Sequence, residues 1–218
     1  MTSPLKIGID IDGVLIDTDD IAYLNYCEKE LGWNINYAEF KKSHSWSIAT
    51  GQNSLAMSDA FREFLSSNKQ SQKLIPGAVD AISKLATIAE IFLITSRRDI
   101  LRDFTEHFIK QHLNGINDIT LSMDNYENKS PRLDEFNLNY FIDDSHTEIS
   151  KILENDKLKT QIIPFPTFHV QPDWSKIKIN EHVIWLNTWQ DITIDIDQSC
   201  KENIQQKAWE EISQRVCL

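Results

Sequence analysis

Cysteine is scarce in this sequence, and the few cysteines present lie far apart. Cys27, Cys200 and Cys217 include no CxxC pair, and their number is odd. Disulfide frameworks and structural zinc sites both need regularly spaced cysteines. We therefore expect reduced thiols in a cytoplasmic protein, which fit this pattern better than disulfides or a zinc centre.

Long apolar runs are missing too. No stretch approaches the roughly 18 consecutive apolar residues that span a bilayer. The opening residues, MTSPLKIGI, lack the charged leader and cleavage site of a secretory signal. The sequence predicts a protein without a membrane segment.

Positive charge is also in short supply. The 22 lysines and arginines face 33 aspartates and glutamates, which leaves a formal net charge of −11. This balance argues against a nucleic-acid polymer or an anionic membrane as partner. It permits a small anionic substrate, because a bound metal ion and a few cations can reverse the field locally.

What the sequence does contain is an alternation of strand-like and helical patterns. We expect a first strand at residues 5–11, a helix at 19–30, short helices over 37–70, and no strand between 17 and 75. The later expected strands are EIFLITS (90–96), DITLS (118–122), NYFIDDS (139–145), TQIIPF (160–165) and HVIWLN (182–187), with helices at 78–88, 99–113, 131–137 and 147–156.

The central strands are too apolar to be half-exposed, so both faces of their sheet should be covered. The sequence thus predicts a doubly wound, Rossmann-like α/β core with a small all-helical cap inserted after the first strand. The expected units are the core (1–16 and 76–195), the cap (17–75) and a C-terminal helical extension (196–218). We expect that extension to pack on the core or on a second subunit in a homodimer.

Polar side chains gather where these strands end, which is where open α/β sheets bind ligands. They are Asp10 and Asp12 after the first strand, Thr95 and Ser96 after EIFLI, Lys129 ahead of the helix before NYFI, and Asp143 and Asp144 after NYFI. Side chains two positions apart on a strand share a face, so Asp10 and Asp12 can enter one site. Asp-Gly after a strand is also a common turn signal, and IDIDG alone fits that reading equally well.

Several carboxylates beside one lysine repel one another unless a cation lies among them. Hard oxygen ligands that leave room for water and phosphate suit Mg²⁺. The chemistry would be phosphoryl transfer, in which one carboxylate attacks phosphorus while the metal and lysine neutralise charge. A second carboxylate would protonate the leaving oxygen.

As a set, the motifs IGIDIDGVLIDT, IFLITSRRD, NKSPR and NYFIDDS resemble the haloacid dehalogenase (HAD) superfamily of phosphatases. The resemblance implies Asp10 as nucleophile and Asp12 as general acid/base, since HAD-type ATPases carry threonine at the second position. It also implies two sets of ligands: Gly13, Thr95, Ser96 and Lys129 for phosphate, and Asp10, the Asp12 backbone carbonyl and Asp144 for Mg²⁺, with Asp143 as an alternate metal ligand.

Within the superfamily, the sequence most resembles the 5′-nucleotidase type C group, which includes the 5′(3′)-deoxyribonucleotidases. The further matching stretches are the cap segment ending SHSWSI, then IPGAVDAISKLA and VIWLNTWQDI. This implies a nucleoside monophosphate as substrate. The sequence departs from the group at Arg97-Arg98-Asp99 and at PFPTFHVQPDW, and SHTEISKILENDK differs from the helix of β-phosphoglucomutase-like enzymes.

The cap supplies further candidates for substrate contact. Trp46 either stacks on a nucleobase or fills the core of the cap. His44 either contacts substrate or is a solvated loop residue. Arg97 is a third candidate contact, and the acidic residues at 17, 19 and 20 are expected to cap the first cap helix.

Three functions follow from the sequence. The leading one is a Mg²⁺-dependent phosphomonoesterase that acts on (deoxy)nucleoside monophosphates through an aspartyl-phosphate. The second is a HAD phosphatase for a sugar phosphate or another small phosphorylated metabolite. The third is a catalytically silent nucleotide-binding module, which the unbroken set of four motifs disfavours.

Overall fold

The computed structural model describes residues 4–43, 45–67, 72–116, 118–125, 128–166, 175, 177 and 180–216, with side chains described up to residue 202. Its centre is a five-stranded parallel sheet in the order β5-β4-β1-β6-β7. The strands are β1 (Leu5–Ile9), β4 (Ala89–Ile94), β5 (Thr120–Ser122), β6 (Tyr140–Asp143) and β7 (Gln161–Pro164). β1 lies in the middle, so its carboxyl end is flanked by those of β4 and β6.

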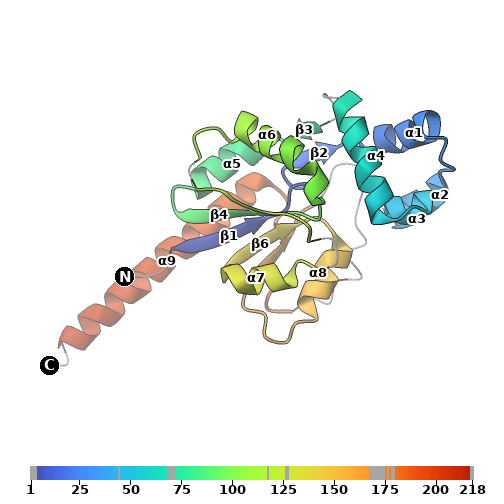
Figure 1. The fold of residues 1–218 in the computed structure, drawn as a ribbon. Coiled ribbons are helices and arrows are strands. Elements are labelled where there is room, and N and C mark those ends of the chain that lie inside the picture. Colours follow the sequence, from blue (N-terminus) through green and yellow to red (C-terminus); the bar gives the residue numbers. More distant parts are fainter. Residues whose placement is uncertain are drawn as a thin grey trace.

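Helices cover both faces of the sheet (Figure 1). On one face lie α5 (Ala78–Leu85), α6 (Arg102–His112, preceded by the 3₁₀ turn Asp99–Leu101) and the start of α9 (Trp189–Val216); on the other lie α7 (Ser130–Phe136) and α8 (His146–Leu153). Alternate β4 side chains point to opposite faces of the sheet. Ile91 and Leu93 pack in the apolar cluster with α5 and α9, whereas Phe92 and Ile94 pack in the apolar cluster with α7 and α8. The predicted doubly wound core is confirmed.

The insertion after the first strand is helical, as predicted. It contains α1 (Asp20–Glu30), α2 (Tyr37–Ser43), α3 (Trp46–Thr50) and α4 (Ser54–Ser67). These helices enclose an apolar cluster that Leu101 and Met123 of the α/β core complete. In it Tyr23, Phe61 and Phe64 are buried, and their rings stack edge to face or in parallel. The cap therefore packs around its own aromatic centre, to one side of the sheet (Figure 1).

The prediction of no strand between residues 17 and 75 was wrong. β2 (Ile16–Thr18) and β3 (Gln72–Leu74) form a two-stranded antiparallel ribbon at the junction of core and cap. Three residues are too few to show a sequence period, and each strand exists because the other pairs with it. Asp17 lies in this ribbon, so it does not cap α1 as expected; Asp19 does, accepting a hydrogen bond from the Ala22 N–H at 2.9 Å.

The expected strand HVIWLN was also wrong, since it forms only an isolated bridge between Ile162 and Val183. The chain then turns into α9, whose start is capped when Thr188 Oγ1 accepts from the Asp191 N–H. The predicted limit of the extension at residue 196 falls inside α9, and Trp189 and Ile196 are buried in the core. The Trp189 indole N–H donates to the Val14 carbonyl at 3.1 Å, which ties α9 to the loop after β1.

The described residues include two of the three cysteines. Cys27 and Cys200 are free thiols, while Cys217 lies outside the described residues. Among the helices in the described part of the chain, none combines the length and the hydropathy needed to cross a membrane.

Candidate active site

The loop after β1 places the first two acidic residues of the site. The Asp10 N–H still donates to the Ile142 carbonyl of β6 at 2.9 Å, so Asp10 extends the sheet. The chain then turns tightly, with the Gly13 N–H donating to the Ile16 carbonyl. Gly13 has φ +79°, and a Cβ there would stand 2.1 Å from Asp144 Oδ2. Glycine therefore allows both the turn and the close approach of Asp144.

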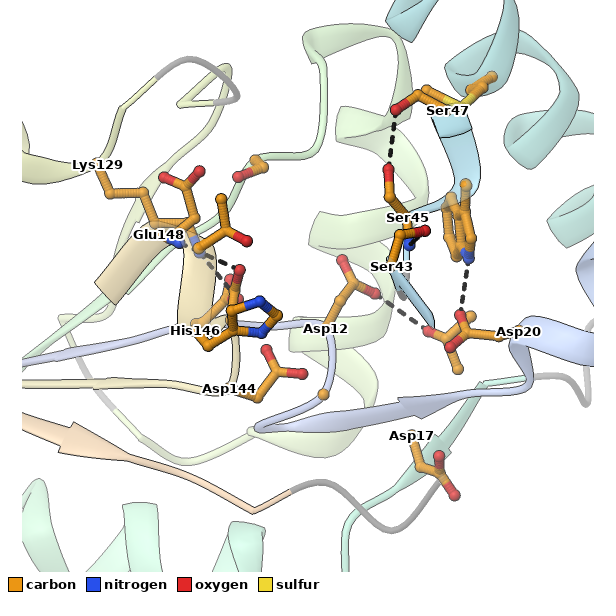
Figure 2. A pocket seen from close by; sticks show the side chains of 18 residues that line it. Asp12, Asp17, Asp20, Ser43, Ser45, Ser47, Lys129, Asp144, His146 and Glu148 are labelled. Atoms are coloured by element: carbon orange, nitrogen blue, oxygen red, sulfur yellow. Dashed lines mark hydrogen bonds and ion pairs between the residues drawn. The ribbon is translucent and has the colours of Figure 1, made fainter. Parts of the chain in front are cut away.

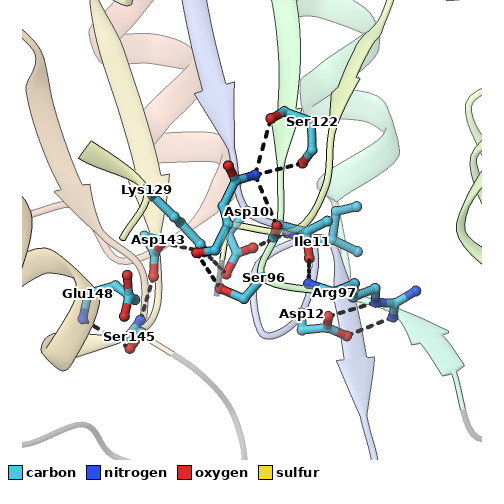
Figure 3. Close-up of polar contacts among 12 residues, drawn as sticks. Asp10, Ile11, Asp12, Ser96, Arg97, Ser122, Lys129, Asp143, Ser145 and Glu148 are labelled. Carbon is cyan, nitrogen blue, oxygen red and sulfur yellow. Dashed lines mark hydrogen bonds and ion pairs between the residues drawn. The ribbon is translucent and has the colours of Figure 1, made fainter. Parts of the chain in front are cut away.

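Lys129 lies between two of the carboxylates (Figure 3). Its Nζ is 2.8 Å from Asp10 Oδ2 and 2.8 Å from Asp143 Oδ2, and all three side chains are buried. Burial alone would lower the pKa of Lys129, but the two carboxylates outweigh it and raise this pKa. The lysine is thus a fixed positive charge beside Asp10, as the sequence predicted.

The charged form of the Asp10 carboxyl is disfavoured despite its lysine partner. Burial raises its pKa to about 7, the attraction of Lys129 opposes this rise, and the charge of Asp143 adds to it. Asp144 behaves alike: burial, with the charges of Asp143 and Asp10, raises its pKa well above the usual range. The site carries more negative charge than its single lysine balances.

Three of these carboxylates could hold a metal ion. Asp10, Asp143 and Asp144 each offer an oxygen, and these oxygens all lie within 4.8 Å of one another. An all-oxygen, negatively charged donor set that its lysine does not neutralise fits Mg²⁺. Asp143, expected only as an alternate ligand, belongs to this group, and it also accepts from the Ser145 N–H at 2.7 Å. The Asp12 side chain is not in the group, and the metal contact expected from its backbone carbonyl remains a prediction.

The Asp12 carboxylate is instead clamped by Arg97 (Figure 3). Arg97 Nε donates to Oδ2 and Nη2 to Oδ1, both at 2.7 Å, and Thr18 Oγ1 donates to Oδ1 at 3.1 Å. Burial would raise the pKa of Asp12, but the Arg97 guanidinium outweighs burial and lowers it. Arg97 is itself buried, bonds Thr105 through Nη1, and does not line the pocket described below. Arg97 thus positions Asp12, and its expected contact with substrate stays a prediction.

The two hydroxyl residues after β4 have different places. Thr95 is buried and its Oγ1 accepts from the Arg97 N–H at 3.1 Å, so it supports the turn after the strand. Ser96 lines the pocket. The Asn125 amide, which no sequence motif marked, donates to the carbonyls of Thr95 and Ser122 and holds this strand end in place. A phosphate contact of Thr95 stays a prediction.

A cavity of about 460 Å³ lies between these strand ends and the cap. Of the predicted site residues, Asp10, Asp12, Gly13, Ser96, Lys129, Asp144 and Trp46 line it. Sequence reasoning missed other lining residues, among them Ser43, Ser45 and Met57 from the cap and Glu148 from α8 (Figure 2). Ser43 and Ser45 lie in the matching cap segment SHSWSI, but the sequence did not single them out, and the fold brings all four residues to the cavity.

Trp46 packs in the core of the cap and also faces the cavity, and its stacking on a nucleobase stays a prediction. Its ring packs against Tyr23, with centroids 4.4 Å apart, and against Phe61 at 5.1 Å. It also lines the cavity, where its indole N–H donates to Asp20 Oδ1 at 3.0 Å. His44, the other predicted cap contact, lies outside the described residues.

Comparison with known proteins adds solved structures of similar fold. No family model matches the chain, and no curated protein matches it. It is similar to a haloacid dehalogenase-like family hydrolase from Streptococcus pneumoniae (19% identity, TM-score 0.61, covering 90% of this chain and 100% of that one). A predicted phosphatase from Clostridium acetobutylicum gives 15% identity and TM-score 0.62, with 90% and 100% covered.

A third similar structure is described as a putative phosphoglycolate phosphatase from Lactobacillus plantarum, with 13% identity, TM-score 0.60, and 88% and 98% covered. The fold is similar to that of these solved structures. At such low identities the likeness concerns the fold: a parallel five-stranded sheet with a helical insertion after the first strand. The chemistry has to be argued from the side chains of this chain.

Proposed function

We propose that this protein is a Mg²⁺-dependent phosphomonoesterase that works through an aspartyl-phosphate on Asp10. The observation that carries the proposal is the contact of Lys129 Nζ with Asp10 Oδ2, at 2.8 Å, inside a group of carboxylates that could hold a cation. Asp12 stands two residues along the same loop and lines the same cavity. The fold shared with haloacid dehalogenase-like hydrolases supports this reading.

Each residue of the site has its own role in the proposed reaction. A carboxylate oxygen of Asp10 attacks phosphorus, and the bond from phosphorus to the ester oxygen breaks. Asp12, which Arg97 keeps ionised in the free protein, first takes the proton that Asp10 loses before its attack and gives it to that oxygen. It then takes a proton from the water that hydrolyses the aspartyl-phosphate. Lys129 balances charge on Asp10 and on the phosphate, and Ser96 and the Gly13 turn face the phosphoryl group.

Mg²⁺, when bound, neutralises negative charge on the phosphate oxygens. Asp10, Asp144 and the Asp12 backbone carbonyl would hold it, with Asp143 beside them. Because Asp143 is also bound to Lys129 and the Ser145 N–H, it fixes the position of the lysine as well.

For the substrate, we propose a small phosphorylated metabolite. A sugar phosphate or similar compound fits a cavity of this size that is lined by serine hydroxyls. A nucleoside monophosphate is the second candidate, and the observation that favours it is the Trp46 ring in the cavity wall, on which a base could stack.

The test is phosphate release from p-nitrophenyl phosphate and from a panel of nucleotides and sugar phosphates, with Mg²⁺ and with EDTA. We expect Mg²⁺-dependent release. A preference for nucleotides over every sugar phosphate would select the second candidate. Nucleotide binding by calorimetry without release of phosphate from any compound would instead indicate a silent binding module.

A further inference from the structure

Negative charge dominates the lining of the cavity. Six carboxylates line it against one lysine: Asp10, Asp12, Asp17, Asp20, Asp144 and Glu148 against Lys129. His146 is the other side chain of the described lining that can carry positive charge. Asp12 pairs with Arg97, Glu148 pairs with Lys151, and Asp10 and Asp144 could share a metal ion, yet the carboxylates of the lining outnumber these cations. The acidity of the remaining wall still needs an explanation.

Two carboxylates of that wall are held in place. Asp20, in the first turn of α1, accepts the Trp46 indole N–H at 3.0 Å, so its charge lies at the edge of the indole. Glu148, in the first turn of α8, binds Lys151 Nζ through Oε1 at 2.6 Å. Figure 2 shows Asp20 on the cap side of the cavity and Glu148 on the core side, with Asp12 between them.

Glu148 also offers an acceptor that the described residues leave unused. Its Oε2 is buried and has no hydrogen-bond partner within the described part of the chain. A buried acceptor without a donor is costly, and a rotation of the Glu148 carboxylate toward the cavity would let a hydroxyl of a bound molecule satisfy it. Serine hydroxyls from Ser43 and Ser45 line the cap side of the same space. The wall can therefore exchange hydrogen bonds with a polyhydroxylated molecule.

We propose that this wall selects phosphomonoesters whose leaving group is uncharged and bears hydroxyls, and that it rejects leaving groups with a carboxylate. The proposal rests on the phosphatase function proposed above. A carboxylate on the leaving group would enter between Asp20 and Glu148, and like charges brought together in a partly buried cavity repel strongly. A hydroxyl at the same place donates to either carboxylate. The preferred substrates thus differ from the phosphoglycolate suggested by the name of one structure of similar fold.

The sharpest test uses two esters that differ only in this charge. Glycerol 3-phosphate and 3-phosphoglycerate share their carbon chain and central hydroxyl, but one ends in a hydroxymethyl group and the other in a carboxylate. We expect kcat/KM for glycerol 3-phosphate to exceed that for 3-phosphoglycerate on the order of tenfold or more, the size expected of one nearby charge pair. 2-Hydroxyethyl phosphate and 2-phosphoglycolate form a second pair with the same expectation.

Variants identify the residues responsible. Asp20→Asn and Glu148→Gln each remove one negative charge from the wall. Each should lower the ratio of kcat/KM for glycerol 3-phosphate to kcat/KM for 3-phosphoglycerate by several-fold, chiefly through a lower KM for 3-phosphoglycerate. Asp59→Asn is the matched control, because Asp59 lies in the cap, pairs with Arg62, and does not line the cavity. The control should leave the ratio unchanged. An equal shift in all three variants would mean that net charge, and not the wall, sets the preference, and it would overturn the proposal.

The two levels of the proposal fail in different ways. Turnover of both esters, with 3-phosphoglycerate equal or better, overturns the selection and leaves the phosphatase function standing. Absence of turnover with these esters and with p-nitrophenyl phosphate overturns the phosphatase function. The selection is then still measured by titrating both esters into the Mg²⁺-loaded protein by calorimetry, and equal affinities would overturn it too.

Discussion

Arg97 grips both carboxylate oxygens of Asp12 through two hydrogen bonds of 2.7 Å. The two residues follow the neighbouring strands β4 and β1, so the sheet itself brings them together. A bidentate pair fixes the plane of the carboxylate as well as its charge. Arg97 thereby determines where the proposed proton donor of the reaction stands.

Replacing Arg97 by lysine should therefore weaken proton transfer more than substrate binding. A lysine keeps the charge but cannot hold both oxygens, so Asp12 loses its fixed position. We expect kcat for an alkyl phosphate to fall about tenfold or more, a part of the 10²–10⁴-fold that positioned proton transfer supplies. KM should change little, because Arg97 does not line the cavity.

The leaving group separates this effect from a general loss of structure. p-Nitrophenolate leaves without a proton, so its phosphate ester should lose much less activity than the alkyl ester in steady-state assays. Thr105→Val is the control, since it removes the Nη1 partner of Arg97 without touching Asp12. An equal loss with both esters would contradict the role given to Arg97.

Gly13 and Gly51 form a natural pair for testing the close approach at the site. Both have positive φ, +79° and +67°, but a Cβ at Gly13 would meet Asp144 whereas one at Gly51 would meet nothing within 4 Å. We expect Gly51→Ala to cost about 1 kcal/mol of unfolding free energy and to keep its activity. Gly13→Ala should in addition displace Asp144 and abolish most activity.

Urea unfolding and phosphate release, measured on both variants, check this pair. The decisive comparison is activity at equal fractions of folded protein. Full activity of a folded Gly13→Ala variant would show that the contact with Asp144 has no role in the reaction.

The raised pKa of Asp10 predicts how Mg²⁺ stabilises the protein. A folded-state pKa of about 7, against an ordinary value of 3.8, means that the metal-free native state binds a proton over this range that the unfolded chain has lost. Stability of the metal-free protein from this group is therefore present below about pH 4 and is lost as the pH rises through 7. A divalent cation held by the ionised carboxylates would reverse that loss.

The rise in Tm caused by Mg²⁺, relative to EDTA, should accordingly be larger at about pH 8 than at about pH 5. Thermal unfolding at the two pH values measures it directly. Asp143→Asn, which removes one of the three grouped carboxylates, should reduce the shift, whereas Asp59→Asn on the cap surface should not. A shift that is independent of pH would argue against a metal site at these residues.

The parts of the fold that the sequence predicted well are those set by local pattern. Apolar runs such as IFLI (91–94) and FI (141–142) are buried on both faces, and their alternation with amphipathic helices leaves little choice of architecture. The β2–β3 ribbon and the failure of HVIWLN as a strand depend on what each segment meets far along the chain. No window of sequence contains that information.

The site divides in the same way. Parallel strands bring their carboxyl ends together, so the meeting of Asp10 and Asp143 followed from the expected strands, whereas the place of Lys129 beside them was implied by the family resemblance. The pairing of Arg97 with Asp12 did not, because nothing in SRRD distinguishes an inward arginine from an exposed one. Glu148 likewise reaches the cavity through the placement of α8, and the residues around Glu148 do not predict that placement.

The most direct test of the central claim is to look for phosphate on Asp10 itself. In Asp12→Asn, the aspartyl-phosphate should form with a good leaving group but lose its base for hydrolysis, so it should accumulate. Acid-quenched protein incubated with Mg²⁺ and p-nitrophenyl phosphate should then carry the mass of one phosphoryl group on the peptide that contains Asp10. The added phosphoryl mass should be missing from the Asp10→Asn, Asp12→Asn double variant. Asp10→Asn alone should lose phosphate-release activity on the order of 10³-fold or more. Undiminished phosphate release by Asp10→Asn, without a label on this peptide, would contradict the mechanism.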